Sequence, residues 1–256
     1  PNLQNIPIRT DSGKEIRKAF VPRNKDFFLM AADYSQIELR VIAALSKEDN
    51  MIRSFEKNED IHLSTAATVF NIPLEKVTKQ QRSHAKIVNF GIIYGVSAFG
   101  LSNQTDLNIK ESKSLIETYY LKYPKLKQFI ENQISFARDK GYVETIIGRR
   151  RILRDINSTN SVVRSAAERN AVNAPIQGSA ADIIKISMIN IQKEFVSKKI
   201  KSKMLLQIHD ELVFDVFKPE LNKVMEIVRY QMENAFKLDI PLSVNIDYGV
   251  NWLEAH

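Results

Sequence analysis

The sequence contains no cysteine, so neither a disulfide framework nor a zinc site with thiolate ligands can form. Only four histidines are present, and we find no zinc-binding pattern among them. The eight glycines and eight prolines form no linker or low-complexity tract, and no internal repeat is visible. No apolar run approaches the length of a membrane-spanning helix, and no secretory signal pattern opens the chain. These absences exclude disulfide-rich, zinc-thiolate and membrane-spanning proteins, and they fit a reducing cytoplasm.

What is present is an ordinary globular composition with a basic excess. The 256 residues are 44% hydrophobic, enough to bury a substantial core. Lys and Arg number 37 against 30 Asp and Glu, which gives a net charge of +7 and a pI near 9.4. Residues 148–151 (GRRR) and 197–203 (SKKIKSK) concentrate this charge. A polyanionic partner would suit the excess, because basic side chains on phosphates release condensed counterions. The chain begins at Pro1 and not at Met, as expected of a fragment or a processed piece.

Hydrophobic periodicity predicts strands at both ends of the chain and helices between them. Residues 27–33, 204–216 and those from 242 onward are rich in the β-branched and aromatic residues typical of strands. The segment 36–46 and most of 50–200 have helical spacing. This order predicts an α+β fold, in which a mostly helical subdomain is inserted into an antiparallel sheet.

Two local signals modify the helical middle. Residues 142–147 (YVETII) predict a short strand. Ser179 begins the sequence SAAD, which resembles a capping box and predicts that a helix starts there.

Charged residues interrupt an apolar run at 203–216 (KMLLQIHDELVFDV). Asp210 and Glu211 would lie at the tip of a hairpin, and a solvated turn is one interpretation of them. The other is a metal site, because Asp33 also closes a predicted buried strand. Two carboxylates at neighbouring strand ends could share divalent ions such as Mg²⁺, although the sequence does not prove that they meet.

The segment 81–95 (QRSHAKIVNFGIIYG) carries a second pattern. On a helix, Arg82, Lys86, Phe90 and Tyr94 recur every four residues and form one stripe, cationic first and aromatic second. This order suits a nucleoside triphosphate, with charge for the phosphates and a flat ring for the base. The alternative is an ordinary amphipathic helix with a solvated basic end and a buried aromatic end.

Together these segments resemble the polymerase region of the bacterial family A DNA polymerases. The A, B and C motifs of that family match, in order, DYSQIELR (33–40), RSHAKIVNFGIIYG (82–95) and QIHDELVF (207–214). Further matches are PNLQNIPIRT (1–10), DIHLSTA (60–66), GYVETIIGRRR (141–151) and ERNAVNAPIQGSAAD (168–182). The resemblance therefore covers essentially the whole chain.

The resemblance implies a role for individual residues. Asp33, Asp210 and the Tyr34 carbonyl would hold two Mg²⁺ ions, and Glu211 would act beside them in catalysis. The residues implied in nucleotide binding are Gln36, Glu38, His62, Arg82, Lys86, Phe90 and Tyr94. Those implied along the primer–template are Asn2, Gln4, Asn5, Arg9, Arg169, Asn173, Gln177 and His209. His84 and His256 match no motif role.

The resemblance also implies an organisation and a set of partners. Residues 1–46 and 161–256 would form the palm and residues 47–160 the fingers, with no thumb or exonuclease domain. The partners would be primer–template DNA and dNTPs, with no membrane. The protein would be monomeric and would act in the cytoplasm at the bacterial nucleoid.

Template-directed DNA synthesis is therefore the expected activity, and two alternatives stay open. A fragment without a thumb could bind nucleic acid without catalysing nucleotide addition. Phage-type RNA polymerases share the layout of the three motifs, although Glu38 and the His-Asp-Glu sequence at 209–211 favour the DNA enzyme.

Overall fold

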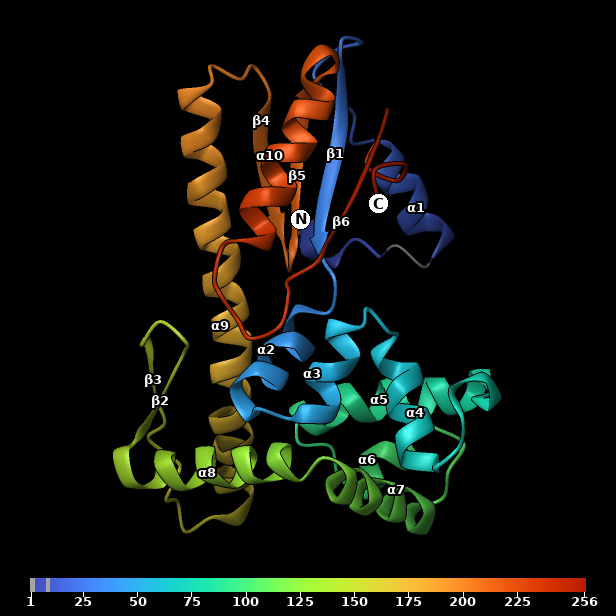
Figure 1. The fold of residues 1–256 in the computed structure, drawn as a ribbon. Coiled ribbons are helices and arrows are strands. Elements are labelled where there is room, and N and C mark those ends of the chain that lie inside the picture. The colour runs from blue at the N-terminus through green and yellow to red at the C-terminus, as the bar shows by residue number, and fades with distance from the viewer. Residues whose placement is uncertain (1–2, 8–9) are drawn as a thin grey trace. The chain divides into compact units, whose positions relative to one another are not determined.

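The computed structural model describes residues 3–7 and 10–256, apart from the side chain of Gln4. The chain divides into two compact units, which we call the sheet unit and the helical unit (Figure 1). The sheet unit consists of Pro1–Ile37, Ala180–Lys237 and Leu242–His256, and the helical unit consists of Glu38–Ser179 and Leu238–Pro241. The predicted class, mixed helix and antiparallel sheet, is confirmed.

The sheet unit is built on four antiparallel strands in the order β4-β5-β1-β6. Their bounds are β1 Phe27–Tyr34, β4 Lys203–Ile208, β5 Glu211–Phe217 and β6 Val244–Gly249. The predicted strands at both ends of the sequence therefore pair with each other, and β1 lies between β5 and β6. Asp33 lies directly opposite Glu211, and Ala31 lies opposite Val213. Residues opposite each other in an antiparallel pair share one face of the sheet.

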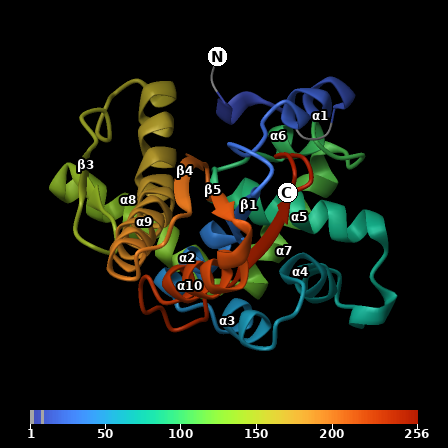
Figure 2. The same cartoon turned by 90° about the horizontal axis from the view of Figure 1, so that it is seen from above.

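Helices α9 (Ser161–Ser197) and α10 (Leu221–Glu233) supply contacts to one face of this sheet. The buried Tyr34 side chain points to this face, where its hydroxyl contacts Ser187 Oγ at 2.7 Å and donates to the Met232 carbonyl at 2.6 Å. Phe195 packs against Phe214 with a ring separation of 6.1 Å. Figure 2 shows α10 on one side of β1 and α1 (Asp11–Lys18) on the other.

The opposite face carries Leu29, Ala31 and Val213 beneath the only tryptophan of the chain, Trp252. Phe20 meets the Trp252 ring edge-on at 5.4 Å, and the Arg17 guanidinium from α1 lies 4.0 Å from its centroid. Since Asp33 and Glu211 belong to this face, the segment that follows β6 packs beside the carboxylates.

The helical unit contains the helices from α2 to α8, the first part of α9 and one small hairpin. The helix bounds are α2 Ile37–Ser46, α3 Asp49–Glu56, α4 Ile61–Phe70, α5 Lys79–Ile93, α6 Ala98–Ser102, α7 Ile109–Lys122 and α8 Pro124–Lys140. The hairpin strands are β2 Tyr142–Glu144 and β3 Arg150–Ile152. The described part of the chain also contains three 3₁₀ turns: η1 Leu3–Asn5, η2 Leu74–Lys76 and η3 Lys218–Glu220.

Local sequence explains where these helices begin. Asp60 caps α4, and Thr78 with Gln81 forms a capping box on α5, as Asn108 does with Glu111 on α7. Pro124 opens α8, where its missing amide proton is not needed.

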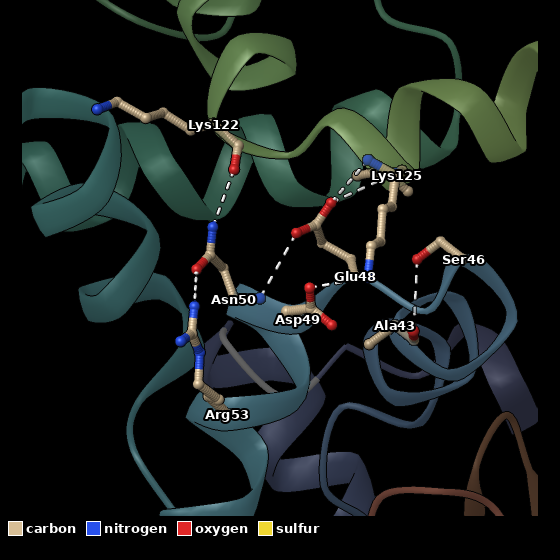
Figure 3. A network of polar contacts seen from close by, with 9 residues as sticks. Ala43, Ser46, Glu48, Asp49, Asn50, Arg53, Lys122 and Lys125 are labelled. Atoms are coloured by element: carbon tan, nitrogen blue, oxygen red, sulfur yellow. Dashed lines mark hydrogen bonds and ion pairs between the residues drawn. The ribbon is translucent and has the colours of Figure 1, made fainter.

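A buried carboxylate ties two of these helices together. Glu48 is 2% exposed and accepts hydrogen bonds from the amides of Lys125 and Leu126 at 3.0 and 3.3 Å (Figure 3). Asn50 donates to the Lys122 carbonyl at 3.0 Å, and Lys125 pairs with Asp49 at 2.7 Å. Glu48 thereby satisfies free amides at the start of α8 while its side chain also caps α3.

Two boundaries differ from the prediction. The helix start predicted at Ser179 is wrong, because α9 runs without a break from Ser161 to Ser197. The Ser179 hydroxyl does not cap; it donates back to the Pro175 carbonyl and accepts from the Ile146 amide. The strand predicted at 142–147 ends at Glu144, because a turn with Gly148 at φ +80° follows it.

No helix in the described part of the chain combines the length and apolarity needed to cross a bilayer.

Candidate active site

The β4–β5 turn brings Asp210 to the end of β1. His209 and Asp210 form a two-residue turn, with His209 at φ +55°, and the Asp210 carbonyl accepts from the Tyr34 amide at 3.3 Å. Glu211, the first residue of β5, lies opposite Asp33. The hairpin predicted at this position is confirmed, and the structure brings together the two aspartates whose meeting the strand pattern alone did not establish.

The surroundings of Asp33 and Asp210 disfavour the ionised form of both carboxyl groups. Burial, followed by the negative charges of Asp210 and Glu211, raises the pKa of Asp33 to about 7, while His256 opposes this shift. Burial also raises the pKa of Asp210. The cluster is therefore a set of partly buried carboxylates whose charges repel each other, and a bound cation would relieve the repulsion.

Glu211 has a different environment from the two aspartates. It is 4% exposed, and its Oε1 accepts from Trp252 Nε1 at 3.0 Å. Its Oε2 pairs with His256 Nδ1, and this hydrogen bond raises the pKa of His256. Both oxygens of Glu211 thus have protein partners. The contact with His256, which matched no motif, joins residues 45 apart in the chain, and no local pattern in the sequence signals it.

Because both oxygens of Glu211 already have protein partners, fewer side chains of the cluster are available to bind a metal ion. Among the described residues, no three His, Cys, Asp or Glu side chains form a metal-binding group. The Tyr34 side chain is buried on the far face, so its main chain is the part that could act as a ligand. Gln36 lies in the turn between β1 and α2 with a left-handed backbone, at φ +54°. The donor set is thus two carboxylates and a carbonyl, which fits a hard cation completed by substrate oxygens.

In the helical unit, α5 carries the predicted stripe of Arg82, Lys86 and Phe90, and Tyr94 is the C-cap. The aromatic end is not buried as in an ordinary amphipathic helix, since Phe90 is half-buried and Tyr94 is 40% exposed. The Tyr94 hydroxyl donates to Glu38 Oε2 at 2.7 Å. The stripe therefore ends at a residue of motif A.

The cationic end of the stripe lies beside α4. Arg82 pairs with Asp60 at 2.7 Å, and Asp60 also accepts from the amides of His62 and Leu63. Burial, together with the positive charges of Lys86 and Arg82 and against the opposing charge of Asp60, lowers the pKa of His62 to about 4. The three residues predicted to bind a triphosphate are therefore close enough to interact, and His62 is uncharged at neutral pH.

The residues predicted along the primer–template lie on several elements. Arg169, Asn173 and Gln177 recur every four residues on α9, so they share one side of that helix. Gly95, at φ +69°, leaves room for Arg169, because a Cβ there would lie 2.7 Å from its Cγ. Asn5 and His209 are exposed. Asn2 and Arg9 lie outside the described residues, as does the side chain of Gln4.

A basic hairpin adjoins the last of these residues. Arg149, Arg150 and Arg151 line a cavity of about 110 Å³ together with Gln177 and Gly178. Arg149 donates to the Gly178 carbonyl at 3.1 Å, and Arg151 is exposed. The GRRR segment thus places positive charge beside the predicted DNA-binding side of α9.

Comparison with known proteins identifies the family. The model for DNA polymerase family A matches residues 1–254. The chain belongs to DNA polymerase family A.

Relatives within this family are about half identical to the chain. DNA polymerase I of Streptococcus pneumoniae (strain ATCC BAA-255 / R6) is 50% identical over 256 residues, which cover 100% of this chain and 29% of that protein. DNA polymerase I of Lactococcus lactis subsp. lactis (strain IL1403) is 51% identical with the same coverage. The chain thus spans less than a third of the length of these curated relatives.

A solved family A structure has the same fold. The polymerase domain of Pol1 from M. smegmatis, in complex with DNA primer-template and dNTP, superimposes with a TM-score of 0.95 at 44% identity. The match covers 100% of this chain and 45% of that chain. The family predicted from the motifs is confirmed.

Proposed function

We propose that the chain catalyses template-directed DNA synthesis, adding dNTPs to a primer 3′-hydroxyl in DNA replication and repair. The observation that carries the proposal is the meeting of Asp33 with Asp210 where the end of β1 lies beside the β4–β5 turn, with repelling charges and raised pKa values. Such a site suits the phosphoryl chemistry of a family A polymerase. In this proposal residues 1–46 and 161–256 act as the palm and residues 47–160 as the fingers.

Asp33, Asp210 and the Tyr34 carbonyl would hold two Mg²⁺ ions. When bound, Mg²⁺ supplies charge stabilisation for the attacking and leaving oxygens of the transfer. Glu211 would lie beside the aspartates with each of its oxygens held by a protein partner, Trp252 or His256.

The helical unit would bind the incoming nucleotide. Arg82 and Lys86 match the charge of the triphosphate, and Arg82 would exchange its ion pair with Asp60 for phosphate. His62 adds an uncharged hydrogen-bond donor, and Phe90 with Tyr94 offers aromatic surface to the new base pair. Glu38 lies under the sugar. Gln36, which matches motif A, belongs to the same nucleotide-binding set.

Primer–template DNA would be held by side chains that test base pairing without reading sequence. Every Watson–Crick pair presents acceptors at equivalent places in the minor groove, so amide and guanidinium donors can probe them. The residues assigned to this role are Asn2, Gln4, Asn5, Arg9, Arg169, Asn173, Gln177 and His209.

Primer extension by this chain tests the proposal. Radiolabelled or fluorescent primer–template is incubated with dNTPs and Mg²⁺, and a parallel reaction contains EDTA. Extension that needs the metal supports the proposal. A gel shift without extension would identify a silent binding fragment, and extension with rNTPs in preference to dNTPs would indicate an RNA polymerase.

Replacing Lys86 with alanine is expected to lower kcat/KM for dNTP by about 100-fold or more, through a higher KM and a lower kcat. The reason is that negative charge on the leaving pyrophosphate grows in the transition state. Single-turnover incorporation with saturating primer–template measures both constants. Lys79→Ala removes the same charge from the first turn of α5 and serves as the control. Equal kinetics in the two variants would contradict the assignment.

Binding of primer–template is expected to be weak and steeply salt-dependent, because it rests on phosphate contacts. About six such contacts would lower the affinity roughly 1,000-fold between about 50 and 200 mM salt. Arg151→Ala should reduce the slope of log K against log salt by about one. Lys113→Ala on α7, where the lysine already faces Glu117, is the matched control. A shallow slope in fluorescence-anisotropy titrations would overturn this expectation.

A further inference from the structure

A buried polar network lies behind His62 in the helical unit. Besides His62 itself, which is 3% exposed, it contains Thr65, Asn89, Tyr119 and Tyr123, each 1% exposed. They come from α4, α5, α7 and the C-cap of α7. Buried polar groups of this kind are retained where their hydrogen bonds are satisfied. Asn89 is central, since three of the other members bond to its amide.

The Tyr119 hydroxyl determines which end of the Asn89 amide is oxygen. Tyr119 donates to Asn89 Oδ1 at 3.0 Å. Thr65 Oγ1 lies 3.2 Å from Oδ1 and 3.1 Å from Nδ2, so it fits either orientation of the amide and does not distinguish them. Among the described residues, the buried Tyr119 hydroxyl has Asn89 Oδ1 as its hydrogen-bond acceptor. Turning the amide by 180° would leave that phenol facing an NH₂ group, which cannot accept its proton. Tyr123 in turn donates to Thr65 at 3.2 Å.

With Oδ1 held in this way, the amide nitrogen of Asn89 faces the imidazole. Asn89 Nδ2 lies 3.1 Å from His62 Nδ1. An NH₂ group can only donate, so Nδ1 must be the bare, accepting nitrogen of the ring. The ring proton of a neutral imidazole then resides on Nε2.

We propose that Asn89 is a positioning residue that holds His62 in the Nε2-protonated tautomer and so makes it an uncharged donor to the triphosphate. This inference rests on the proposed function, in which His62 contacts the nucleotide. The groups around the ring explain why a neutral donor is useful. Arg82 and Lys86 already act on it with positive charge, Asp60 caps the same helix, and Phe90 lies 5.7 Å away. A third cation beside Arg82 and Lys86 would repel them, whereas a neutral N–H adds a directed hydrogen bond.

Nitrogen-15 NMR of the histidine rings tests the tautomer without any need for activity. Two-bond proton–nitrogen correlations distinguish a protonated from a bare ring nitrogen, and His62→Gln identifies the signals among the four histidines. In the whole chain at neutral pH, His62 is expected to show a protonated Nε2 and a bare Nδ1. A protonated Nδ1 would overturn the proposal.

Asn89→Asp tests whether position 89 controls the ring. The volume is nearly unchanged, but a carboxylate can only accept, so His62 Nδ1 should become protonated in the same spectra. If Nδ1 stays bare in this variant, Asn89 does not set the state of His62.

Kinetics test the consequence for nucleotide binding. Asn89→Leu is expected to raise the KM for dNTP about 3- to 10-fold, the effect of about one hydrogen bond, and to leave kcat within about twofold. In the His62→Gln background the same change should add nothing, because its effect passes through the ring. An equal loss in both backgrounds, or a loss confined to kcat, would show a merely structural role.

Tyr119→Phe provides a milder variant should Asn89→Leu fail to fold. It removes the phenolic donor that orients the amide and keeps the ring. We expect a smaller rise in KM, about two- to fivefold, and partial protonation of His62 Nδ1. Unchanged spectra and KM in this variant would refute the proposed orientation. Absence of extension by the unaltered chain would instead count against the proposed function, while the NMR arms would still decide the tautomer.

Discussion

Replacing Asp33 or Asp210 with asparagine is expected to reduce primer extension by about 1,000-fold or more, which corresponds to about 4 kcal/mol of transition-state stabilisation. Each aspartate would provide one carboxylate ligand, since both oxygens of Glu211 have protein partners. An asparagine retains the shape but not the charge that attracts a divalent cation. Primer–template affinity should change less than threefold, because phosphate contacts elsewhere carry it. Single-turnover extension and anisotropy titration measure the two quantities.

Folding can be separated from chemistry in these variants. The pKa of Asp33 is raised in the folded state, so ionised Asp33 destabilises the fold as the pH rises from its ordinary value of 3.8 toward about 7. Asparagine carries no charge, and the Tm of Asp33→Asn at neutral pH should equal or exceed that of the unaltered chain. Asp247→Asn, an exposed carboxylate on β6 in register with Ala31, is the matched control and should extend normally. Activity retained by Asp33→Asn would exclude the assigned role.

The carboxylate cluster shows what sequence can predict and what it cannot. Asp210 interrupts an apolar run and Asp33 closes one, so these runs alone predicted two strand ends with charge. Their meeting depends on β1 pairing with β5, which joins segments about 180 residues apart in the sequence. The partners of Glu211 depend on a further packing step, in which Trp252 covers the same face. Only the folded chain contains that information.

The error at Ser179 has a similar origin. A serine followed by an acidic residue three positions later favours a helix start when considered locally. In α9 the preceding residues Ala171, Ala174 and Ile176 are buried. Their packing stabilises helical backbone before Ser179, so the helix does not start at the predicted cap. The Ser179 hydroxyl then donates to the Pro175 carbonyl and accepts from the Ile146 amide instead of capping a helix end. Tertiary contacts outweigh a capping preference of about 1 kcal/mol.

The α5 stripe was predictable because it uses only the spacing of one helix. The residues that contact this stripe could not be predicted from that spacing. Asp60, which pairs with Arg82, and Asn89, which faces His62, take their roles from the packing of α4 against α5. Asn89 is buried on the inner side of α5. It does not belong to the stripe of charged and aromatic residues by which the sequence identified this helix.

The second large effect is expected at Glu38, where alanine should increase the acceptance of ribonucleotides roughly 30- to 1,000-fold, on the order of 2–4 kcal/mol of lost discrimination. A ribonucleotide differs by one 2′-hydroxyl, and an apolar pocket rejects an added hydroxyl only modestly. Strong rejection needs a filled volume in a rigid position. The half-buried Glu38 side chain is held by the Tyr94 hydroxyl at 2.7 Å, and Tyr94 ends the helix that carries Lys86.

The ratio of kcat/KM for dCTP to that for rCTP, measured in single-nucleotide incorporation with saturating primer–template, decides the role of Glu38. Tyr94→Phe removes the hydrogen bond but keeps the glutamate, so it should relax discrimination less than Glu38→Ala, because the volume remains while its rigidity is lost. Glu56→Ala, an exposed glutamate on α3, removes equal charge and should leave the ratio unchanged. If the ratio in Glu38→Ala stays within about twofold of the unaltered chain, the volume that excludes the 2′-hydroxyl belongs to another residue.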